Sequence, residues 1–208
     1  MSLPSAELRA LLDATLAHYE GRAEAFWAAT RDHDVTQNRD ALLAALGPGG
    51  PWTILDVGCG PGRDLKAFSE LGHRAIGVEA VPRFVAMARA HSGCEVWQQD
   101  FLALDLAEAS CDGVYANASL FHVPRQSLPL VLTRLHAALR PGGVFFASNP
   151  RGAGEEGYRD GRYAVLYDWA TWRRLVEATG FDLLSQYYRP GDVPVAHARW
   201  IASVWRRI

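Results

Sequence analysis

An acid and three glycines lie close together in residues 54–64, ILDVGCGPGRD. Residues 53–57 form a short apolar run that is typical of a strand buried on both faces, as in a parallel sheet. A carboxylate there is costly unless a donor or a cation meets it, so we expect Asp56 to emerge into a ligand cleft. Gly58, Gly60 and Gly62 would let the backbone turn tightly and approach that ligand.

The spacing of the glycines separates the kinds of nucleotide loop. A dinucleotide fingerprint, G-x-G-x-x-G, would need its third glycine at position 63, which is Arg63, and Pro61 lies inside the loop. No Gly-Lys-Ser/Thr follows, which excludes the phosphate loop of nucleotide hydrolases. An acid beside the loop suits a cationic ligand such as S-adenosylmethionine, which carries an ammonium and a sulfonium. On the loop alone, an incidental glycine turn in an α/β protein stays open.

Two further acids close apolar runs. Glu79 follows the run 74–78 and lies 23 positions after Asp56, where a ribose-binding acid falls in nucleotide-binding folds. Asp100 follows the run 94–98 and could accept a hydrogen bond from an adenine amino group, while Phe101 packs on the purine. For both acids the alternative is a solvated surface charge. If Glu79 binds ribose, Glu79→Ala should weaken the cofactor by about 1.5 to 3 kcal/mol and leave the fold intact.

These segments together resemble the class I S-adenosylmethionine-dependent methyltransferases of the small bacterial type that act on small molecules. The resemblance covers about residues 50–150: the glycine loop, GVEAV at 77–81, QQDF at 98–101, DGVYANASLFHVP at 112–124, and LRPGG at 139–143 before GVFFAS. It implies S-adenosylmethionine as cofactor and S-adenosylhomocysteine as product. The cofactor-binding residues that we expect are Tyr19, Asp56, Gly58, Gly60, Gly62, Glu79, Ala80, Asp100, Phe101 and Asn117.

Helical and strand patterns alternate along the chain. We expect helices at 5–20, 22–32, 37–46, 65–71, 128–139 and 169–179, and strands at 53–57, 74–78, 94–98, 113–117, 144–148, 181–188 and 199–205. This alternation predicts an α/β fold, a Rossmann-like three-layer sandwich with a mostly parallel sheet of seven strands. The resemblance implies that the last strand is antiparallel. We expect one domain over 1–208, with a helical N-terminal lid at 1–47 and the Rossmann-like core at 52–208.

Composition limits the partners and the compartment. A net charge of −2 with one lysine, Lys66, gives no basic patch for nucleic acid. Three cysteines, no metal-ligand spacing, and no signal-peptide core or membrane span predict a cytoplasmic protein without a metal. We therefore expect a small-molecule substrate, no nucleic acid and no membrane, and the sequence does not indicate an oligomeric state.

The acceptor site is the least defined part of the sequence. A lid should come from the N-terminal helices, the long connection at 149–167 and the loop at 190–198. The substrate-binding residues that we expect are Trp27, His33, His122, Arg151, Tyr163 and Tyr167. His122, five positions beyond the strand end at Asn117, could act as a general base, or it could be a packing or cofactor-orienting histidine. We expect His33, His122 and Arg151 to converge on one small, largely enclosed pocket.

Two functions remain open from the sequence. The favoured one is an enzyme that transfers a methyl group from S-adenosylmethionine to an O, N or S atom of a small-molecule metabolite. The alternative is a catalytically inactive S-adenosylmethionine-binding module that serves as a regulator or partner. A nucleic-acid or protein methyltransferase is disfavoured, because no Asn/Asp-Pro-Pro-Tyr/Phe segment follows the fourth strand, where residues 117–120 read NASL. Binding of S-adenosylmethionine but not of NAD is expected.

Overall fold

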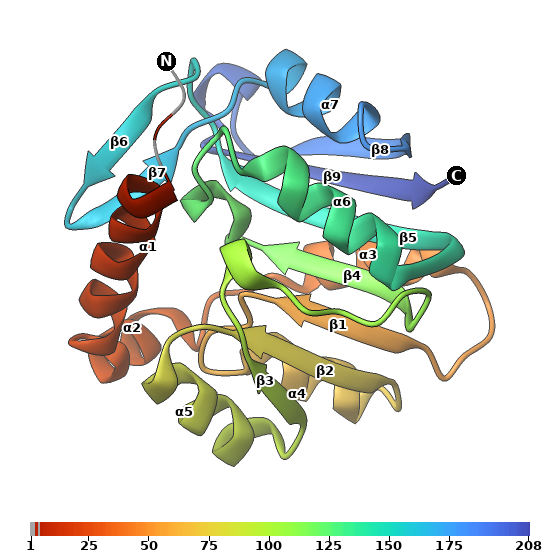
Figure 1. The fold of residues 1–208 in the computed structure, drawn as a ribbon. Helices are drawn as coiled ribbons and strands as arrows, with labels where there is room; N and C mark the ends of the chain where they lie inside the picture. Colours follow the sequence, from red (N-terminus) through yellow and green to blue (C-terminus); the bar gives the residue numbers. More distant parts are fainter. Residues whose placement is uncertain (1–2, 4) are drawn as a thin grey trace.

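A seven-stranded sheet forms the centre of the computed structural model, which describes residue 3 and residues 5–208. Its strands are β1 (Thr53–Val57), β2 (Arg74–Glu79), β3 (Glu95–Gln98), β4 (Cys111–Asn117), β5 (Leu139–Pro150), β8 (Phe181–Arg189) and β9 (Trp200–Arg207). They lie side by side in the order β3-β2-β1-β4-β5-β9-β8 (Figure 1). All seven strands expected from the sequence are therefore present.

The pairing of the strands confirms a Rossmann-like sheet. β1 pairs in parallel with both β2 and β4, β2 with β3, and β4 with β5. The last strand, β9, is inserted between β5 and β8 and runs antiparallel to both. Because chain order reverses between β1 and β4, the carboxyl ends of these two strands border a crevice, which is where ligands bind in open α/β sheets.

Helices cover both faces of the sheet and complete the three layers (Figure 1). One face carries α3 (Thr36–Leu46), α4 (Arg63–Glu70) and α5 (Pro82–Ser92), and the other carries α6 (Leu128–Ala138) and α7 (Trp169–Glu177). Three single turns of 3-10 helix lie in the connections, η1 (Phe101–Ala103), η2 (Leu120–His122) and η3 (Val195–His197). The helices expected from sequence agree with these to within about two residues, except that α5 was not anticipated.

Large apolar side chains fill the space on each side of the sheet. Tyr115 of β4 and Phe146 of β5 stack with ring centroids 4.9 Å apart, and Phe68 of α4 meets Tyr115 edge-on at 5.1 Å. On the opposite face, Trp172 and Trp205 are fully buried. Each such side chain contributes about 1.5 to 3 kcal/mol of burial, so the sheet is a rigid platform for the residues at its carboxyl edge.

Two N-terminal helices and a hairpin lie beside that carboxyl edge. They are α1 (Ser5–Glu20), α2 (Ala23–Thr30), and the strands β6 (Glu156–Arg159) and β7 (Arg162–Val165) (Figure 1). α1 packs against β7, where the backbone amide of Tyr163 donates to Thr15 Oγ1 at 2.9 Å. Residues 149–167 therefore are not the open loop that the sequence suggested, because they fold into an antiparallel pair that α1 covers.

The three N-terminal helices do not all belong to the expected lid. Leu42 of α3 is fully buried together with Ile54 of β1 and Tyr115 of β4, so α3 belongs to the core layer rather than to the lid. Only α1 and α2 stand outside the sandwich, and residues 1, 2 and 4 of the expected lid lie outside the described residues. In the part of the chain that the structure describes, no helix is long and apolar enough to cross a membrane.

Candidate functional site

The glycine loop lies between β1 and α4 and depends on two of its glycines. Gly58 has a φ of 74°, and a Cβ there would lie 2.4 Å from the Cβ of Ser119. Gly62 has a φ of 91°, and a Cβ there would come within 2.8 Å of the Cα of Ala88 on α5. The loop therefore passes close to η2 on one side and to α5 on the other, which only glycine permits.

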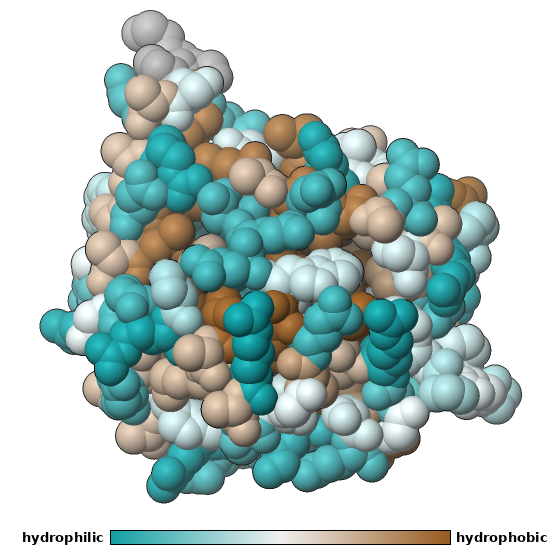
Figure 2. Space-filling view, turned by 60° about the horizontal axis from the view of Figure 1, so that its bottom comes forward, coloured by the Kyte–Doolittle hydropathy of each residue, from teal (hydrophilic) through white to brown (hydrophobic). Residues whose placement is uncertain are grey.

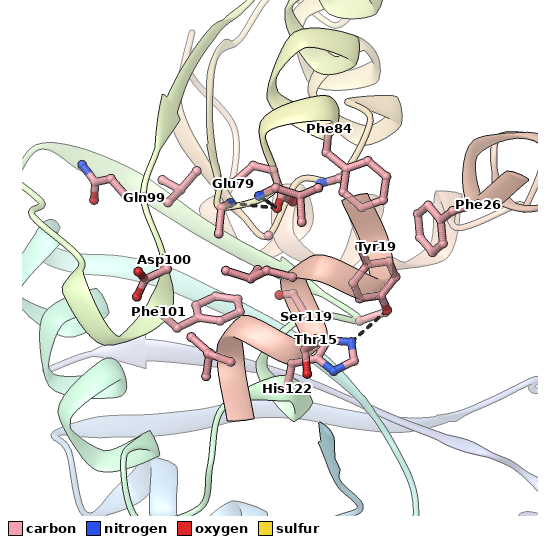
Figure 3. Close-up of a pocket in the computed structure, with 18 residues that line it drawn as sticks. Thr15, Tyr19, Phe26, Glu79, Phe84, Gln99, Asp100, Phe101, Ser119 and His122 are labelled. Atoms are coloured by element: carbon pink, nitrogen blue, oxygen red, sulfur yellow. Dashed lines mark hydrogen bonds between the residues drawn. The ribbon is translucent and has the colours of Figure 1, made fainter. Parts of the chain in front are cut away.

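A first cavity of about 680 Å³, including its mouth, lies between this loop, the ends of β2 and β3, and α1 (Figure 3). The residues that line it are Leu12, Thr15, Leu16, Tyr19, Phe26, Gly58, Gly60, Val78, Glu79, Ala80, Val81, Phe84, Gln99, Asp100, Phe101, Ala118, Ser119 and His122. Apolar and aromatic walls with a few acids suit a purine nucleoside. Figure 2 shows hydrophobic atoms in recesses between hydrophilic side chains on one face of the molecule.

Glu79 anchors the loop as well as facing this cavity. Its Oε2 accepts from the backbone amide of Gly60 at 2.9 Å, and its Oε1 accepts from those of Ala80 at 2.8 Å and Val81 at 2.9 Å. Burial raises the pKa of the Glu79 carboxyl, and these three donors oppose that rise. Ribose hydroxyls would donate to the same carboxylate. The expectation that Glu79→Ala leaves the fold intact conflicts with the structure, because the substitution also removes three contacts of the loop.

Asp100 forms an ion pair with a residue of the N-terminal helix α1. Its Oδ1 accepts from the amide of Leu102 at 2.8 Å and caps η1, and its Oδ2 accepts from Arg9 of α1 at 2.7 Å. Arg9 also forms an ion pair with Asp13 one turn along the same helix, at 2.6 Å. Asp100 lines the first cavity as expected, and Phe101 lies beside it (Figure 3). The Arg9–Asp100 pair fastens α1 over this end of the cavity.

A second, larger cavity of about 1800 Å³, including its mouth, adjoins the first. Both are lined by Tyr19, Phe26, Gly58, Gly60 and Ala118, so the two cavities meet at these residues. The second cavity is further lined by Trp27, Thr30, His33, Asp34, Val35, Asn38, Asp56, Cys59, Pro61, Arg63, Asp64, Asn117, Phe121, Ser148, Arg162, Arg189, Pro190 and Trp200. A ligand that fills the first cavity can therefore extend past the glycine loop and meet a second molecule.

Asp56 is the unsatisfied acid of the second cavity. Its side chain is buried, and its Oδ2 has no hydrogen-bond partner among the described residues. Burial, and after it the nearby Asp64, raises the pKa of Asp56 well above its ordinary value. Asp64, by contrast, is paired with Arg39 and Arg63, each at 2.8 Å. A buried carboxyl without a cation fits the ammonium of a methionine moiety, as expected from the sequence.

Both ring nitrogens of His122 have a hydrogen-bond partner, and Figure 3 shows the bond to Tyr19. Its Nδ1 lies 2.6 Å from the backbone carbonyl oxygen of Tyr163 and must donate to it, so its Nε2, 2.9 Å from the Tyr19 hydroxyl, accepts from Tyr19. Burial lowers the pKa of His122 to about 4. The imidazole is therefore neutral near pH 7, and its basic nitrogen is occupied by Tyr19.

The structure brings together some of the expected acceptor residues and separates others. Trp27 and His33 line the second cavity, and His122 lines the first. Arg151, Tyr163 and Tyr167 line neither. Arg151 donates to the backbone of the 190–198 loop and lies 4.8 Å from the ring centroid of Tyr188. Tyr163 and Tyr167 turn into the core beneath the hairpin, so His33, His122 and Arg151 do not converge on one pocket.

Several residues in or beside the cavities were not anticipated from the sequence. Phe121 and Trp200 line the second cavity, Arg9 pairs with Asp100 of the first, and no local pattern marks the three as site residues. Gly62, which we expected to bind cofactor, lines neither cavity and serves the packing of α4 on α5. Among the described residues, no group of three or more His, Cys, Asp or Glu side chains could hold a metal ion.

Comparison with known proteins finds methyltransferases that are similar to this chain. A family model described as a methyltransferase domain matches residues 54–143. The chain is 35% identical over 125 residues to 24-methylenesterol C-methyltransferase 2 of Oryza sativa subsp. japonica, covering 56% of this chain and 32% of the relative. It is 37% identical over 102 residues to the ubiquinone biosynthesis O-methyltransferase of Xanthomonas campestris pv. campestris (strain B100), covering 46% and 41%. The chain thus spans about a third to a half of these relatives.

A solved structure has the same fold over nearly the full length of both chains. It is Burkholderia thailandensis 1,6-didemethyltoxoflavin-N1-methyltransferase with bound 1,6-didemethyltoxoflavin and S-adenosylhomocysteine. The TM-score is 0.82 with 24% identity, and the match covers 100% of this chain and 93% of the other. At that identity the match speaks for the fold, and it includes α1, α2 and the hairpin as well as the sheet.

Proposed function

We propose that this chain, whose residues 54–143 match the model of a methyltransferase domain, transfers a methyl group from S-adenosylmethionine to an O, N or S atom of a small molecule. The observation that carries this proposal is that the two cavities adjoin at the glycine loop. Residues that suit an adenosine line the first cavity, and the second has the unpaired Asp56 carboxyl together with additional room. That room adjoins the glycine loop, where the reacting methyl group would lie.

When bound, S-adenosylmethionine supplies a methyl carbon on a positively charged sulfur. Methyl transfer is an in-line displacement: the lone pair of the acceptor atom forms the new bond to carbon, the sulfur keeps the electron pair of the broken bond, and any acceptor proton leaves. Glu79 and Asp100 would hold the nucleoside, and Asp56 would meet the ammonium. Tyr19 and Phe26, which line both cavities, would restrict water and fix the approach of the acceptor.

His122 acts most directly on Tyr19 in this arrangement. Its accepting nitrogen is occupied by the Tyr19 hydroxyl, and its lowered pKa makes it a weak base. We therefore propose that its first role is to position Tyr19. In His122→Asn, loss of this role should weaken S-adenosylhomocysteine binding as well as turnover. A general base would instead give a fall in turnover of about 10²-fold with unchanged binding.

The elements around the second cavity also bear on partners and compartment. A space flanked by α1, α2 and the 190–198 loop admits a metabolite more readily than a duplex or a folded protein. The cysteines Cys59, Cys94 and Cys111 are all free, which suits a reducing compartment, so we propose the cytoplasm as the place of action. Fractionation of the producing cells would test this location.

The proposed activity can be tested without knowing the acceptor. Purified protein is incubated with methyl-labelled S-adenosylmethionine, with and without the small-molecule fraction of a bacterial extract, and S-adenosylhomocysteine is measured by mass spectrometry. We expect the extract to raise its release, and the labelled product to reveal whether O, N or S is methylated. Binding of S-adenosylmethionine with no stimulation by any extract would favour a catalytically inactive binding module. Binding of NAD in its place would refute the proposal.

A further inference from the structure

Arg162 differs from the other arginines of the second cavity. Arg63 pairs with Asp64 at 2.8 Å, and Arg189 donates to the backbone oxygen of Asp34 at 2.8 Å. Arg162, half-buried on β7, makes one side-chain hydrogen bond among the described residues, from Nη1 to the Tyr19 hydroxyl at 3.1 Å. Its Nε is buried without a partner, and no carboxylate of the described residues forms an ion pair with it.

A partly buried guanidinium without an anion is energetically unfavourable. Taking a charge out of water has a cost that is recovered when a carboxylate or similar group binds it in fork geometry. Its other close contact is the ring of Tyr19, whose centroid lies 5.6 Å from the guanidinium carbon. A phenol ring and one phenol oxygen do not neutralise the charge. The geometry therefore leaves donor positions on Arg162 for a ligand.

Arg162 lies beside the space that a methyl acceptor would occupy. Arg162 lines the second cavity and holds Tyr19, which lines both, so the guanidinium lies where the two cavities join. The wall of the same cavity includes Phe121 and Trp200, whose ring centroids are 6.2 Å apart with an angle of 78° between the planes. A flat ring can pack against such a corner of two aromatic faces.

We propose that Arg162 is the specificity-determining residue for the acceptor and that the acceptor is a planar aromatic acid. Its anionic group is bound by Arg162, and its ring packs against Phe121 and Trp200. The anionic group serves as the anchor, because a group neutralised by arginine is a weak nucleophile. This inference rests on the proposed methyl-transfer function.

Ligand binding to the S-adenosylhomocysteine complex tests the inference without turnover. The probes are 2-naphthoate and its neutral amide, 2-naphthamide, titrated by calorimetry into protein saturated with S-adenosylhomocysteine. We expect the acid to bind about tenfold or more tightly than the amide, because only the acid makes charge-assisted hydrogen bonds. Cyclohexanecarboxylate, an acid without a flat ring, should bind more weakly than 2-naphthoate.

Variants assign the preference to one side chain. Arg162→Gln should remove the advantage of the acid over the amide, and Arg162→Lys should retain part of it. Arg159→Gln changes an exposed arginine of the same hairpin and should behave as the wild type. Equal affinity for acid and amide, unchanged preference in Arg162→Gln, or no binding of 2-naphthoate at about 10 mM would overturn the inference. Failure of the wild type to bind S-adenosylhomocysteine would instead overturn the proposed function.

Discussion

Glu79 offers the sharpest test of how the cofactor site is built. Three backbone amides, from Gly60, Ala80 and Val81, donate to its carboxylate, and the same group faces the cavity where a ribose would lie. In Glu79→Ala, the three backbone amides lose the acceptor of their hydrogen bonds. The ribose of the cofactor loses the carboxylate that would accept from its hydroxyls. Affinity and stability should therefore fall together.

The magnitude follows from the kind of bond that is lost. A hydrogen bond to a charged group contributes about 1.5 to 3 kcal/mol, so the loss of ribose contacts should weaken S-adenosylhomocysteine about 10- to 150-fold. Water can enter the cavity and satisfy part of the loop, so we expect the loop to lose about 1 to 3 kcal/mol of stability rather than the sum of three bonds. For a chain of this length, that loss lowers the melting temperature by about 2 to 10 °C.

Calorimetry with S-adenosylhomocysteine and thermal unfolding of the ligand-free protein measure the two effects separately. Glu108→Ala, an exposed acid in the connection before β4, is the matched control and should change neither quantity. An unchanged dissociation constant in Glu79→Ala would show that the carboxylate does not meet the cofactor. A weakened cofactor with an unchanged melting temperature would show that the three backbone contacts do not stabilise the loop.

Three further changes probe other parts of the site. Asp56→Asn should weaken the binding of S-adenosylmethionine about tenfold or more. Because the pKa of Asp56 is raised in the wild type, binding of a cation releases a proton, and the affinity for S-adenosylmethionine should rise with pH up to that pKa. Calorimetry in buffers of different ionisation enthalpy should detect this proton release only when Asp56 is present. Burial lowers the pKa of His122 to about 4, below its value in the unfolded chain, so the neutral imidazole contributes up to about 3 kcal/mol to the free energy of unfolding above about pH 6.5, and this contribution is lost as the pH drops through 4. Denaturant unfolding of His122→Gln should show a weaker dependence of stability on pH. An unchanged dependence would argue against a buried neutral imidazole. Arg9→Gln removes the ion pair with Asp100 and should speed S-adenosylhomocysteine release in stopped-flow measurements, whereas equal release rates would show that α1 is fastened elsewhere.

Local sequence signals were enough to predict that three acids lie at the same edge of the sheet. Asp56, Glu79 and Asp100 each follow an apolar run, and because parallel strands bring their carboxyl ends to one edge, the three acids had to lie along one crevice. The spacing of Gly58, Gly60 and Gly62 predicted a close approach of the backbone to a ligand, whereas the close contacts that the structure shows at Gly58 and Gly62 are with Ser119 and Ala88.

The hairpin at 156–165 contains a turn sequence that an interpretation based on composition overlooked. Asp160 and Gly161 both have positive φ, 50° and 79°, which is the backbone of a tight two-residue turn, and an Asp-Gly pair is typical of such turns. On either side, Tyr158 and Tyr163 face each other as paired residues. The abundance of Gly, Arg and Tyr suggested an open loop, and only the order of these residues indicates strands.

The acceptor half could not be assembled from the sequence in the same way. Arg162, Phe121 and Trp200 meet in one cavity although they come from β7, η2 and the start of β9. Which side chain of an Arg- and Tyr-rich segment enters a cavity depends on the strand register. One residue of shift would exchange Arg162 for Tyr163, which turns into the core. That register is fixed by contacts with α1, about 150 residues away.

The insertion of β9 between β5 and β8 has a consequence for synthesis of the protein on the ribosome. β8 pairs only with β9, and β5 meets β8 only through it. Until Trp200–Arg207 has left the exit tunnel, β8 has no partner and β5 presents a free edge, while β1 to β4 can already pair. The nascent chain can thus pair β1 to β4 early but completes the wall that carries Trp200 only after β9 has emerged. Edges left open until then are sites for aggregation, so slow synthesis of residues 200–207 should increase the need for chaperones.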